Sequence, residues 1–227
     1  NWLNGFRRNI TKKATFFKID ISDTKKLNNI FLIKKFDFVF HFAALINNEE
    51  SLKYPKKYFK NNYEKGKIFL QCCIENNLTN IIYSSTAAVY GNRLKKVDEN
   101  DLLNPISPYS RSKLKLENFL KKNKEKINCI ILRYFNVAGT DIKYRCGFNI
   151  NNKYNLILNL CAACIKNKKF VINGDKFKTK DGTTIRDFIH VLDLAQIHVL
   201  LAKKLYKKKK FKIFNCGYGQ GSSVREI

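Results

Sequence analysis

Short apolar runs, rich in β-branched and aromatic residues, alternate along this chain with longer segments of helical periodicity. Runs of this kind occupy 36–44, 81–85 and 129–136, and the segments between them repeat apolar residues every three or four positions. Strands that alternate with helices in this way form βαβ units, whose parallel sheet lies between two layers of helices. We therefore predict an α/β fold built on a doubly wound parallel sheet.

The individual elements follow from the same periodicities and from capping residues. Strands are predicted at 14–21, 36–44, 81–85, 129–136, 170–174 and 212–217, and helices at 22–35, 55–75, 156–166, 190–205 and from 107 onward. After Gly139 the pattern becomes polar, which indicates a second, smaller lobe. We expect one domain at 1–139, to which 187–217 returns, and a smaller C-terminal lobe at 140–186 and 218–227.

The chain carries a formal charge of +26 at pH 7, which raises the question of nucleic-acid binding. The excess comes from lysine, since only eight of the 44 basic residues are arginine, the residue that base readout and bidentate phosphate contacts favour. We therefore expect a solvated basic surface and no nucleic-acid partner. No run of eighteen apolar residues occurs, so we also expect no membrane partner and, by default, a cytoplasmic protein.

The cysteines number seven and lie mostly in apolar segments, which favours reduced, buried thiols over a disulfide framework. Cys161 and Cys164 form one CxxC pair. Because no second pair and no nearby histidine completes a zinc ligand set, we predict that both cysteines pack in a core and that the chain binds no metal.

The segment SPYSRSKLKLE at 107–117 combines a serine cap and a proline with Tyr109 and Lys113, which a helix places on one face. The pair could simply pack, with the lysine extending past the ring to water. It could instead be catalytic, because a nearby ammonium lowers the pKa of a phenol and so makes it a general base. Ser84, Ser85 and Thr86, at the carboxyl end of a predicted strand, would supply a hydroxyl partner.

Seven blocks of the sequence occur in the order of one protein family, and the similarity extends over essentially the whole chain. They are DFVFHFAAL, ESLKYPKKYFKNNYEKG, IIYSSTAAVYG, PYSRSKLKLE, ILRYFNVAG, TKDGTTIRDFIHVLDLA and FNCGYGQGSSVREI. The sequence resembles the UDP-glucose 4-epimerases (UDP-galactose 4-epimerases), which are extended short-chain dehydrogenases. The resemblance implies a Rossmann-like fold with a truncated first βαβ unit and a substrate lobe. It also implies NAD-dependent epimerisation at C4 of a UDP-hexose through a transient 4-keto intermediate, and a homodimer formed through 55–75 and 108–122.

The resemblance implies a role for each residue that matches a family motif. Tyr109 would be the catalytic base, Lys113 its pKa-lowering, ribose-binding partner, and Thr86 the proton relay. The residues implied to contact NAD are Asn4, Asp20, Ile21, Phe42, Ala43, Ala44, Asn62, Ser84, Tyr109, Lys113, Tyr134 and Phe135. The residues implied to contact the UDP-sugar are Thr86, Tyr109, Asn136, Asn155, Leu156 and Arg186, with the guanidinium of Arg186 on the diphosphate.

The sequence also departs from the family pattern. It contains no G-x-x-G-x-x-G turn for the cofactor's pyrophosphate, so we expect that the chain begins after two strands of the fold, ends before its last segment and by itself binds NAD poorly. Ile46 stands where many epimerases carry a lysine, and Asn173 where an apolar residue often precedes a glycine. Ala87 and Ala88 replace the acidic pair with which related dehydratases eliminate water. Epimerases of UDP-glucuronate or UDP-N-acetylhexosamine, and an inactive dinucleotide-binding regulator, remain alternatives.

Overall fold

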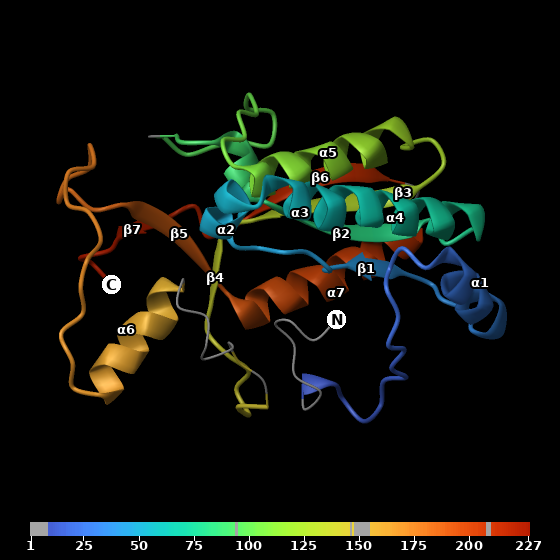
Figure 1. Ribbon diagram of the computed structural model, residues 1–227, viewed down its shortest axis with the longest axis horizontal. Coiled ribbons are helices and arrows are strands. Elements are labelled where there is room, and N and C mark those ends of the chain that lie inside the picture. The colour runs from blue at the N-terminus through green and yellow to red at the C-terminus, as the bar shows by residue number, and fades with distance from the viewer. Residues whose placement is uncertain (1–8, 94, 146, 148–154, 208–209) are drawn as a thin grey trace. The chain divides into compact units, whose positions relative to one another are not determined.

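The structure is a computed structural model that describes residues 9–93, 95–145, 147, 155–207 and 210–227. Figure 1 shows its helices and strands in chain order. The predicted α/β class is confirmed, because strands and helices alternate through most of the chain. The elements are α1 (Thr24–Ile33), β1 (Val39–His41), α2 (Asn48–Lys53), α3 (Pro55–Tyr58), the π-helix η2 (Phe59–Glu64), α4 (Lys65–Glu75), β2 (Asn80–Thr86), the 3₁₀-helix η3 (Ala87–Tyr90), α5 (Pro108–Lys122), β3 (Asn128–Tyr134), β4 (Asn136–Ala138), α6 (Leu156–Ile165), β5 (Ile185–His190), α7 (Val191–Lys207), β6 (Phe211–Cys216) and β7 (Gly221–Ser223).

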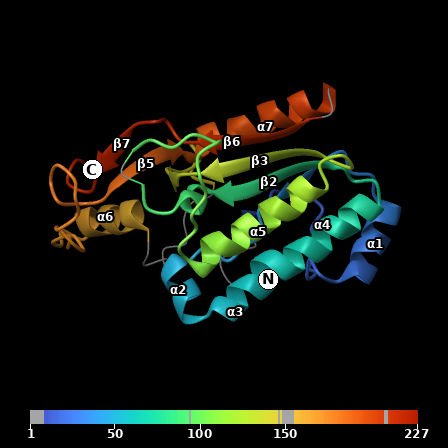
Figure 2. The same ribbon diagram turned by 90° about the horizontal axis from the view of Figure 1, so that it is seen from above.

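The main sheet has the strand order β1-β2-β3-β6, and every neighbouring pair is parallel. Figure 2 shows α4 and α5 on one side of this sheet and α7 on the other. β2 and β3 are buried along nearly their whole length, as strands covered on both faces must be. Their carboxyl ends therefore meet at one edge, where Thr86 of β2 is the neighbour of Tyr134 of β3.

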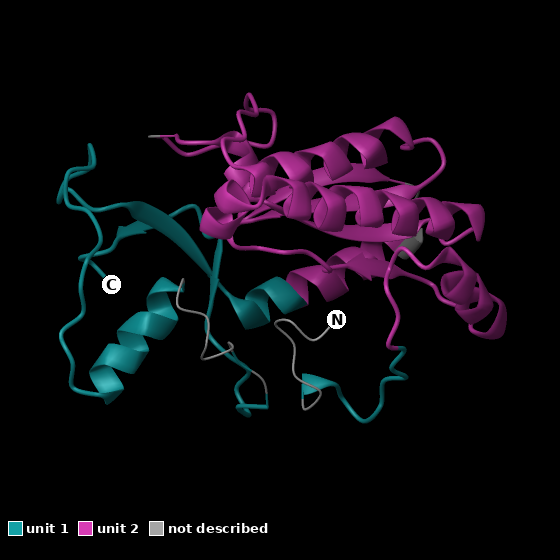
Figure 3. Ribbon diagram, viewed as in Figure 1, with its two compact units in different colours: residues 1–17, 135–195, 217–227 teal, residues 18–134, 196–216 magenta. Residues whose placement is uncertain are grey.

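The residues form two compact units, shown in different colours in Figure 3. One unit contains 18–134 and 196–216 and holds the main sheet, and the other contains 1–17, 135–195 and 217–227. The second unit has its own small sheet of order β4-β5-β7, in which β4 runs parallel and β7 antiparallel to β5. The units divide after Tyr134, close to the predicted change of pattern after Gly139, and the predicted domain limits stay a prediction.

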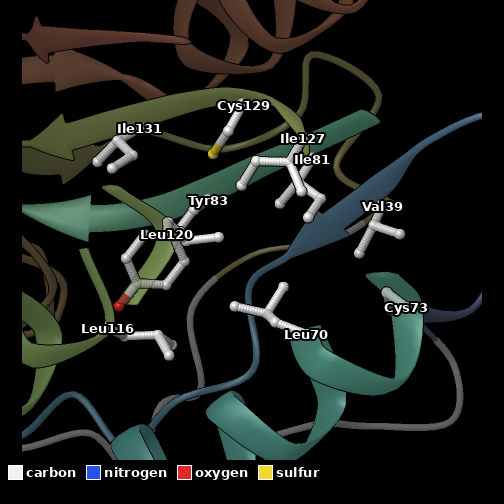
Figure 4. Packing of buried hydrophobic residues seen from close by; sticks show 10 residues of the cluster. All are labelled: Val39, Leu70, Cys73, Ile81, Tyr83, Leu116, Leu120, Ile127, Cys129 and Ile131. Atoms are coloured by element: carbon white, nitrogen blue, oxygen red, sulfur yellow. The ribbon is translucent and has the colours of Figure 1, made fainter. Parts of the chain in front are cut away.

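The core of the main-sheet unit lies between the sheet and the helices α4 and α5 (Figure 4). Alternate residues of β2 and β3, such as Ile81, Tyr83 and Ile131, point to this side and pack against Leu116 and Leu120 of α5. All five are fully buried. Each such side chain contributes about 1.5–3 kcal/mol by its burial, so the packing firmly fixes α5 against the sheet.

α5 begins where the sequence predicted, because two capping signals coincide. The Ser107 hydroxyl accepts from the Ser110 amide at 3.1 Å, and the Ser110 hydroxyl accepts from the Ser107 amide at 3.2 Å. Pro108 takes the first helical position, where its missing N–H costs no hydrogen bond. Tyr109 therefore lies in the first turn of the helix, at the edge of the sheet to which β2 and β3 deliver their carboxyl ends.

Two predicted strands are wrong. Residues 14–21 and 170–174 form no strand, although both are apolar and β-branched or aromatic. A strand exists only where a neighbour pairs with it, and no described strand pairs with either segment. The predicted helix at 55–75 is confirmed in outline, but its second turn is the π-helix η2. The helices at 22–35, 156–166 and 190–205 and the strand at 212–217 are confirmed within a few residues.

The predictions for the cysteines are confirmed in part. Cys72, Cys73, Cys129 and Cys216 are buried and unpaired, as predicted, whereas Cys161 and Cys164 are exposed on α6. The prediction that this CxxC pair packs in a core is therefore wrong. An apolar helix sequence does not reveal which of its faces, if any, will be covered. In the described part of the chain, no helix combines the length and hydropathy needed to cross a bilayer.

Candidate active site

Three residues predicted to be catalytic lie together at the carboxyl edge of the main sheet. Thr86 is the last residue of β2, and Tyr109 and Lys113 lie one turn apart at the start of α5. The Thr86 hydroxyl accepts from the Ala88 amide at 3.2 Å, which fixes its rotamer as the cap of η3. The same hydroxyl lies close enough to the Tyr109 phenol to lower the pKa of that phenol. The structure thus joins a strand-end hydroxyl to a helix-start phenol.

Lys113 is buried and donates from Nζ to the backbone carbonyl of Ser84 at 2.6 Å. Its ammonium also lies 5.0 Å from the centre of the Tyr83 ring, a cation–π distance. Burial lowers the pKa of Lys113 to about 7, and the negative charge of Glu117 acts in the opposite direction. A lysine ammonium has three donors, so donor capacity beyond the bond to Ser84 remains for a ribose hydroxyl.

The pKa of Tyr109 is raised above its usual value of 10.0, because the phenol is desolvated, while the contact with Thr86 lowers it. The sequence argument predicted the opposite net direction, with the Lys113 ammonium lowering the pKa of Tyr109. That prediction is wrong for the protein alone, since burial outweighs the contact with Thr86, which lowers the pKa of Tyr109. The Tyr58 and Tyr109 rings are nearly perpendicular, with 6.5 Å between their centres, and this contact contributes to the burial of Tyr109.

Ser84 and Tyr134, two residues implied to contact NAD, meet on the side of the sheet that α7 covers. The Tyr134 phenol lies 2.6 Å from Nε2 of His198, and the nearby Ser84 side chain lowers the pKa of that phenol. Burial raises the pKa of Tyr134. The Phe42 ring lies nearby, 5.1 Å from the His198 ring, and is half-exposed. Ala43 is exposed and Ala44 is partly buried, so this segment presents an apolar surface after β1.

Asn62 lies in the π-helix η2, a feature that often marks a functional position. Its Oδ1 accepts from the Leu45 amide at 2.8 Å, and its Nδ2 donates to the Leu45 carbonyl at 2.9 Å and to the Ser112 hydroxyl at 3.2 Å. The buried amide therefore ties the segment after β1 to α5. It supports the implied cofactor wall through Leu45, and its direct contact with NAD stays a prediction.

Asp20 pairs with Lys65 of α4 and accepts from the Ser22 amide at 2.9 Å. These contacts, first of all that with Lys65, hold the pKa of Asp20 well below its usual range. Ile21 beside it is partly buried, and Ile46 is 60% exposed. The carboxylate is thus fixed and charged. Asn4 lies outside the described residues.

The residues implied to bind the sugar nucleotide belong to the other unit, apart from Thr86 and Tyr109. Asn136 starts β4 and is the neighbour of Phe188 in β5, the strand that also carries the exposed Arg186. Asn155 caps α6 by accepting from the Leu158 amide at 2.9 Å, and Leu156 follows it as the first helical residue. Phe135 lies directly before β4 and is partly buried.

A loop with several hydrogen bonds precedes Arg186. The Asp181 carboxylate accepts from the Thr183 amide and from the Thr183 hydroxyl, both at 2.8 Å, and from the Ser223 hydroxyl. The backbone of Gly182 adopts φ +78°, and a Cβ there would lie 2.0 Å from the Asp175 carbonyl oxygen, so only glycine fits. The TKDGTT sequence thus builds a fixed turn that leads into β5.

Sequence reasoning missed a buried charged group beside the catalytic residues. Glu117 lies one turn after Lys113 and forms a salt bridge of 2.8 Å with Arg133 of β3, and both side chains are almost completely buried. The Ser85 hydroxyl also donates to Glu117. The signal was present, because Glu117 lies on the apolar face of a predicted helix and Arg133 within an apolar strand. A pair of opposite charges in two predicted core positions indicates a contact.

The comparisons with known proteins agree on one assignment. A family model described as the NAD dependent epimerase/dehydratase family matches residues 3–217. The chain belongs to this family and, within it, to the UDP-glucose 4-epimerases. It is 37% identical over 227 residues to the UDP-glucose 4-epimerase of Lactobacillus helveticus, covering 98% of this chain and 69% of that protein. The sequence resemblance and the Rossmann-like fold are both confirmed.

Solved structures of UDP-glucose 4-epimerases have the same fold. That from Brucella ovis in complex with NAD matches with a TM-score of 0.90 at 34% identity, over 99% of this chain and 70% of that one. That from Bifidobacterium longum in complex with NAD⁺ and UDP matches with a TM-score of 0.88 at 30% identity, over 100% and 71%. The chain spans about two thirds of the length of its curated relatives.

NAD is the cofactor of this family, which confirms the prediction of that cofactor. The site fits the ribose and nicotinamide end of the molecule, because Lys113 and Tyr109 supply buried donors beside Ser84. The apolar segment of Phe42 to Ala44 suits one face of a planar ring. That these residues hold the reactive half of NAD stays a prediction, with which the donors and the apolar segment are compatible.

Proposed function

We propose that the protein interconverts UDP-glucose and UDP-galactose by NAD-dependent epimerisation at C4 of the hexose. The observation that carries the proposal is the placement of the Thr86 hydroxyl, at the end of β2, beside the Tyr109 phenol, whose pKa it lowers, with the Lys113 ammonium one turn along α5. Packing alone does not require a hydroxyl at the end of a strand to meet a phenol at the start of a helix. A general base held within reach of a sugar hydroxyl, with a second hydroxyl that can relay the proton, is an arrangement suited to proton transfer.

The chain's residues divide the proton chemistry between them. Tyr109 takes the proton of the C4 hydroxyl, directly or through Thr86, and returns it after the sugar has turned over in the site. The raised pKa of Tyr109 suits the return step, because a phenol with a high pKa holds its proton firmly. Lys113 offsets the charge of the phenolate during the forward step. NAD, when bound, supplies the acceptor and donor of the C4 hydride.

Binding of the sugar nucleotide is assigned to the unit that contains β4, β5 and α6. Arg186 is exposed on β5, and a guanidinium suits a diphosphate because its donors match two phosphate oxygens. The Asp181 turn fixes the start of β5 and so limits the motion of Arg186. Asn136, Asn155 and Leu156 are the further residues proposed to contact the nucleotide or the sugar.

The proposal includes a cytoplasmic homodimer. Six cysteines of the described chain are unpaired, in keeping with a reducing compartment. Exposed apolar side chains, among them Leu52, Tyr54 and Ile68, lie on or beside the helices of 48–75, a composition that suits an interface. A sedimentation experiment would give twice the mass of one chain, and the mass of a single chain would reject the dimer.

The test uses UDP-galactose that carries deuterium at C4, with protein expressed from the complete gene. Hydride that leaves C4 and returns to it brings the deuterium into UDP-glucose. The proposal therefore predicts UDP-glucose with the label retained at C4, measured by mass spectrometry and NMR. Loss of the label to solvent would reject the mechanism. Absence of any interconversion, in a preparation shown to contain NAD, would reject the activity itself.

A further inference from the structure

Glu117 is a buried carboxylate to which the reaction described above gives no role. It lies on α5 one turn after Lys113 and two turns after Tyr109, and its side chain is 3% exposed. Arg133 of β3 donates to both of its oxygens, from Nε at 3.2 Å and from Nη2 at 2.8 Å. The Ser85 hydroxyl of β2 donates to Oε1 as well. Glu117 thus contacts both central strands of the sheet.

The register of the sheet links this cluster to Lys113. Ser85 and Arg133 are direct neighbours across β2 and β3. Ser84, the residue before Ser85, accepts through its carbonyl from the Lys113 ammonium at 2.6 Å. Consecutive turns of α5 are therefore attached to consecutive residues of β2, Lys113 to Ser84 and Glu117 to Ser85. The attachment sets both the height and the rotation of α5 over the sheet.

Arg133 is itself fixed from the side opposite Glu117. Its Nη1 donates to the Tyr90 phenol at 2.8 Å and to the Glu99 carbonyl at 3.2 Å. Tyr90 in turn donates to Asn215 at 2.8 Å. A buried ion pair of this kind is costly to form and stabilises the fold little compared with apolar residues. Its position beside the catalytic residues therefore calls for another explanation.

The effect of Glu117 on the charge of Lys113 supplies that explanation. The groups that surround Lys113 are His41 from β1, Tyr83 from β2, Tyr109 and Glu117 from α5, and, through Glu117, Cys129 and Arg133 of β3. His41 is buried, and its pKa is lowered to about 3 by burial and by the charge of Lys113, so it is neutral. Of the groups named, Glu117 is the one carboxylate, ion-paired with Arg133, and it raises the pKa of Lys113. It alone among them favours the charged form of Lys113.

We propose that Glu117 is a positioning residue for the epimerisation: anchored by Arg133 and Ser85, its carboxylate keeps the Lys113 ammonium charged and held against β2. This role rests on the proposed function, because it acts through Lys113. Glu117 itself touches neither the sugar nor the cofactor in this role. Lys113 must be charged to offset the Tyr109 phenolate, so turnover falls as pH rises through the pKa of Lys113. Without Glu117 that fall occurs at lower pH.

Two substitutions separate charge from packing. Glu117→Gln keeps the size and an acceptor for Arg133 but removes the charge, whereas Glu117→Asp keeps the charge and shortens the side chain. In the pH profile of kcat, Glu117→Gln should move the alkaline limb to lower pH by at least about 1 unit. Glu117→Asp should leave that limb within a few tenths of a unit of the wild-type position. Glu75→Gln, which removes an exposed carboxylate on α4, should change neither kcat nor its profile.

A purely structural role predicts a different result. Glu117→Gln would then lower kcat by one factor at every pH, or only lower the unfolding midpoint, and an unmoved limb in that variant would overturn the proposal. If the wild type interconverts no UDP-sugar at any pH, the proposed function fails. The effect of Glu117 on the charge of Lys113 is then tested by the pH dependence of the free energy of unfolding. The free energy of unfolding should rise with pH above the folded pKa of Lys113, and Lys113→Met should abolish this rise. In Glu117→Gln the rise should begin at lower pH than in the wild type. An unchanged onset would overturn the proposal.

Discussion

Replacement of Gly66 by alanine tests the packing that holds α5, and with it Tyr109 and Lys113, in place. Gly66 is a buried residue of α4. A Cβ at this position would lie 2.8 Å from Cδ2 of Leu116 and 3.3 Å from Nε2 of His41. Leu116 belongs to the core cluster and is fully buried, so it moves only by displacing its neighbours. The glycine is therefore what allows α4 to approach α5 so closely.

Two opposing effects set the size of the change. Alanine in a helix interior is more favourable than glycine by about 1 kcal/mol. Overpacking of a well-filled core costs about 1–3 kcal/mol. The contact of the new Cβ with Leu116 is shorter than carbon atoms tolerate, and its contact with His41 is tight. We therefore place the cost of overpacking in the middle of that range. The expected net effect of Gly66→Ala is a loss of about 1 kcal/mol in the free energy of unfolding.

A double-mutant cycle with Leu116 identifies the cause. Leu116→Ala alone should cost about 3 kcal/mol, because it empties a fully buried position. In the double variant, the new methyl group at Gly66 enters the space that the leucine has left. The double variant should therefore be more stable than the sum of the single effects predicts, by at least about 1 kcal/mol.

The assay is reversible urea unfolding followed by circular dichroism, on protein expressed from the complete gene. Lys67→Ala, an exposed substitution on the same helix, serves as the control and should change stability by less than about 0.5 kcal/mol. If Gly66→Ala stabilises the protein, or if the double variant is additive, then the contact between α4 and α5 does not limit the size of residue 66 and the reasoning fails.

Three further predictions concern the site and its surroundings. Thr86→Val should lower turnover at least about 100-fold, because it removes the hydroxyl that meets the phenol, while urea unfolding shows a loss of no more than about 2 kcal/mol from the η3 cap. His41 has a folded pKa of about 3 against an ordinary value of 6.5. Its contribution to the free energy of unfolding is therefore complete above pH 6.5 and declines as pH falls towards 3, by at most about 1.4 kcal/mol per pH unit. His41→Gln should flatten that part of the curve of stability against pH, and an unchanged slope would refute the lowered pKa of His41. Alkylation mapped by mass spectrometry should label the exposed Cys161 and Cys164 within the time that leaves the buried Cys129 unmodified, and equal labelling would contradict the placement of α6.

The sequence was sufficient for α5 and for the central strands, because each was determined locally. A serine, a proline and apolar residues at helical spacing marked the start and face of α5, and the runs at 81–85 and 129–136 were apolar enough to require burial on both faces. The segments at 14–21 and 170–174 carried equally good strand composition and form no strand. Composition shows that a segment can pair, whereas pairing itself depends on a partner elsewhere in the fold.

The same distinction applies to the site. The residue types of Tyr109, Lys113 and Thr86 were readable from spacing and from family resemblance, and the structure places them together. The direction of the shift in the pKa of Tyr109 was not readable, because it depends on how deeply the phenol is buried. The pairing of Glu117 with Arg133 had a local signal, two opposite charges in predicted core positions, but its attachment to Ser85 depends on the register of β2 and β3, which no local pattern reveals.

The most direct test of the central claim is the turnover of Tyr109→Phe in the interconversion of UDP-galactose and UDP-glucose. The substitution removes one oxygen atom and leaves the ring that packs against Tyr58, so the free energy of unfolding should change by less than about 1 kcal/mol. Tyr54→Phe, at an exposed tyrosine, is the matched control and should keep wild-type turnover. The account predicts that Tyr109→Phe lowers kcat by at least about 100-fold, and a kcat within a factor of two of the wild type would contradict it.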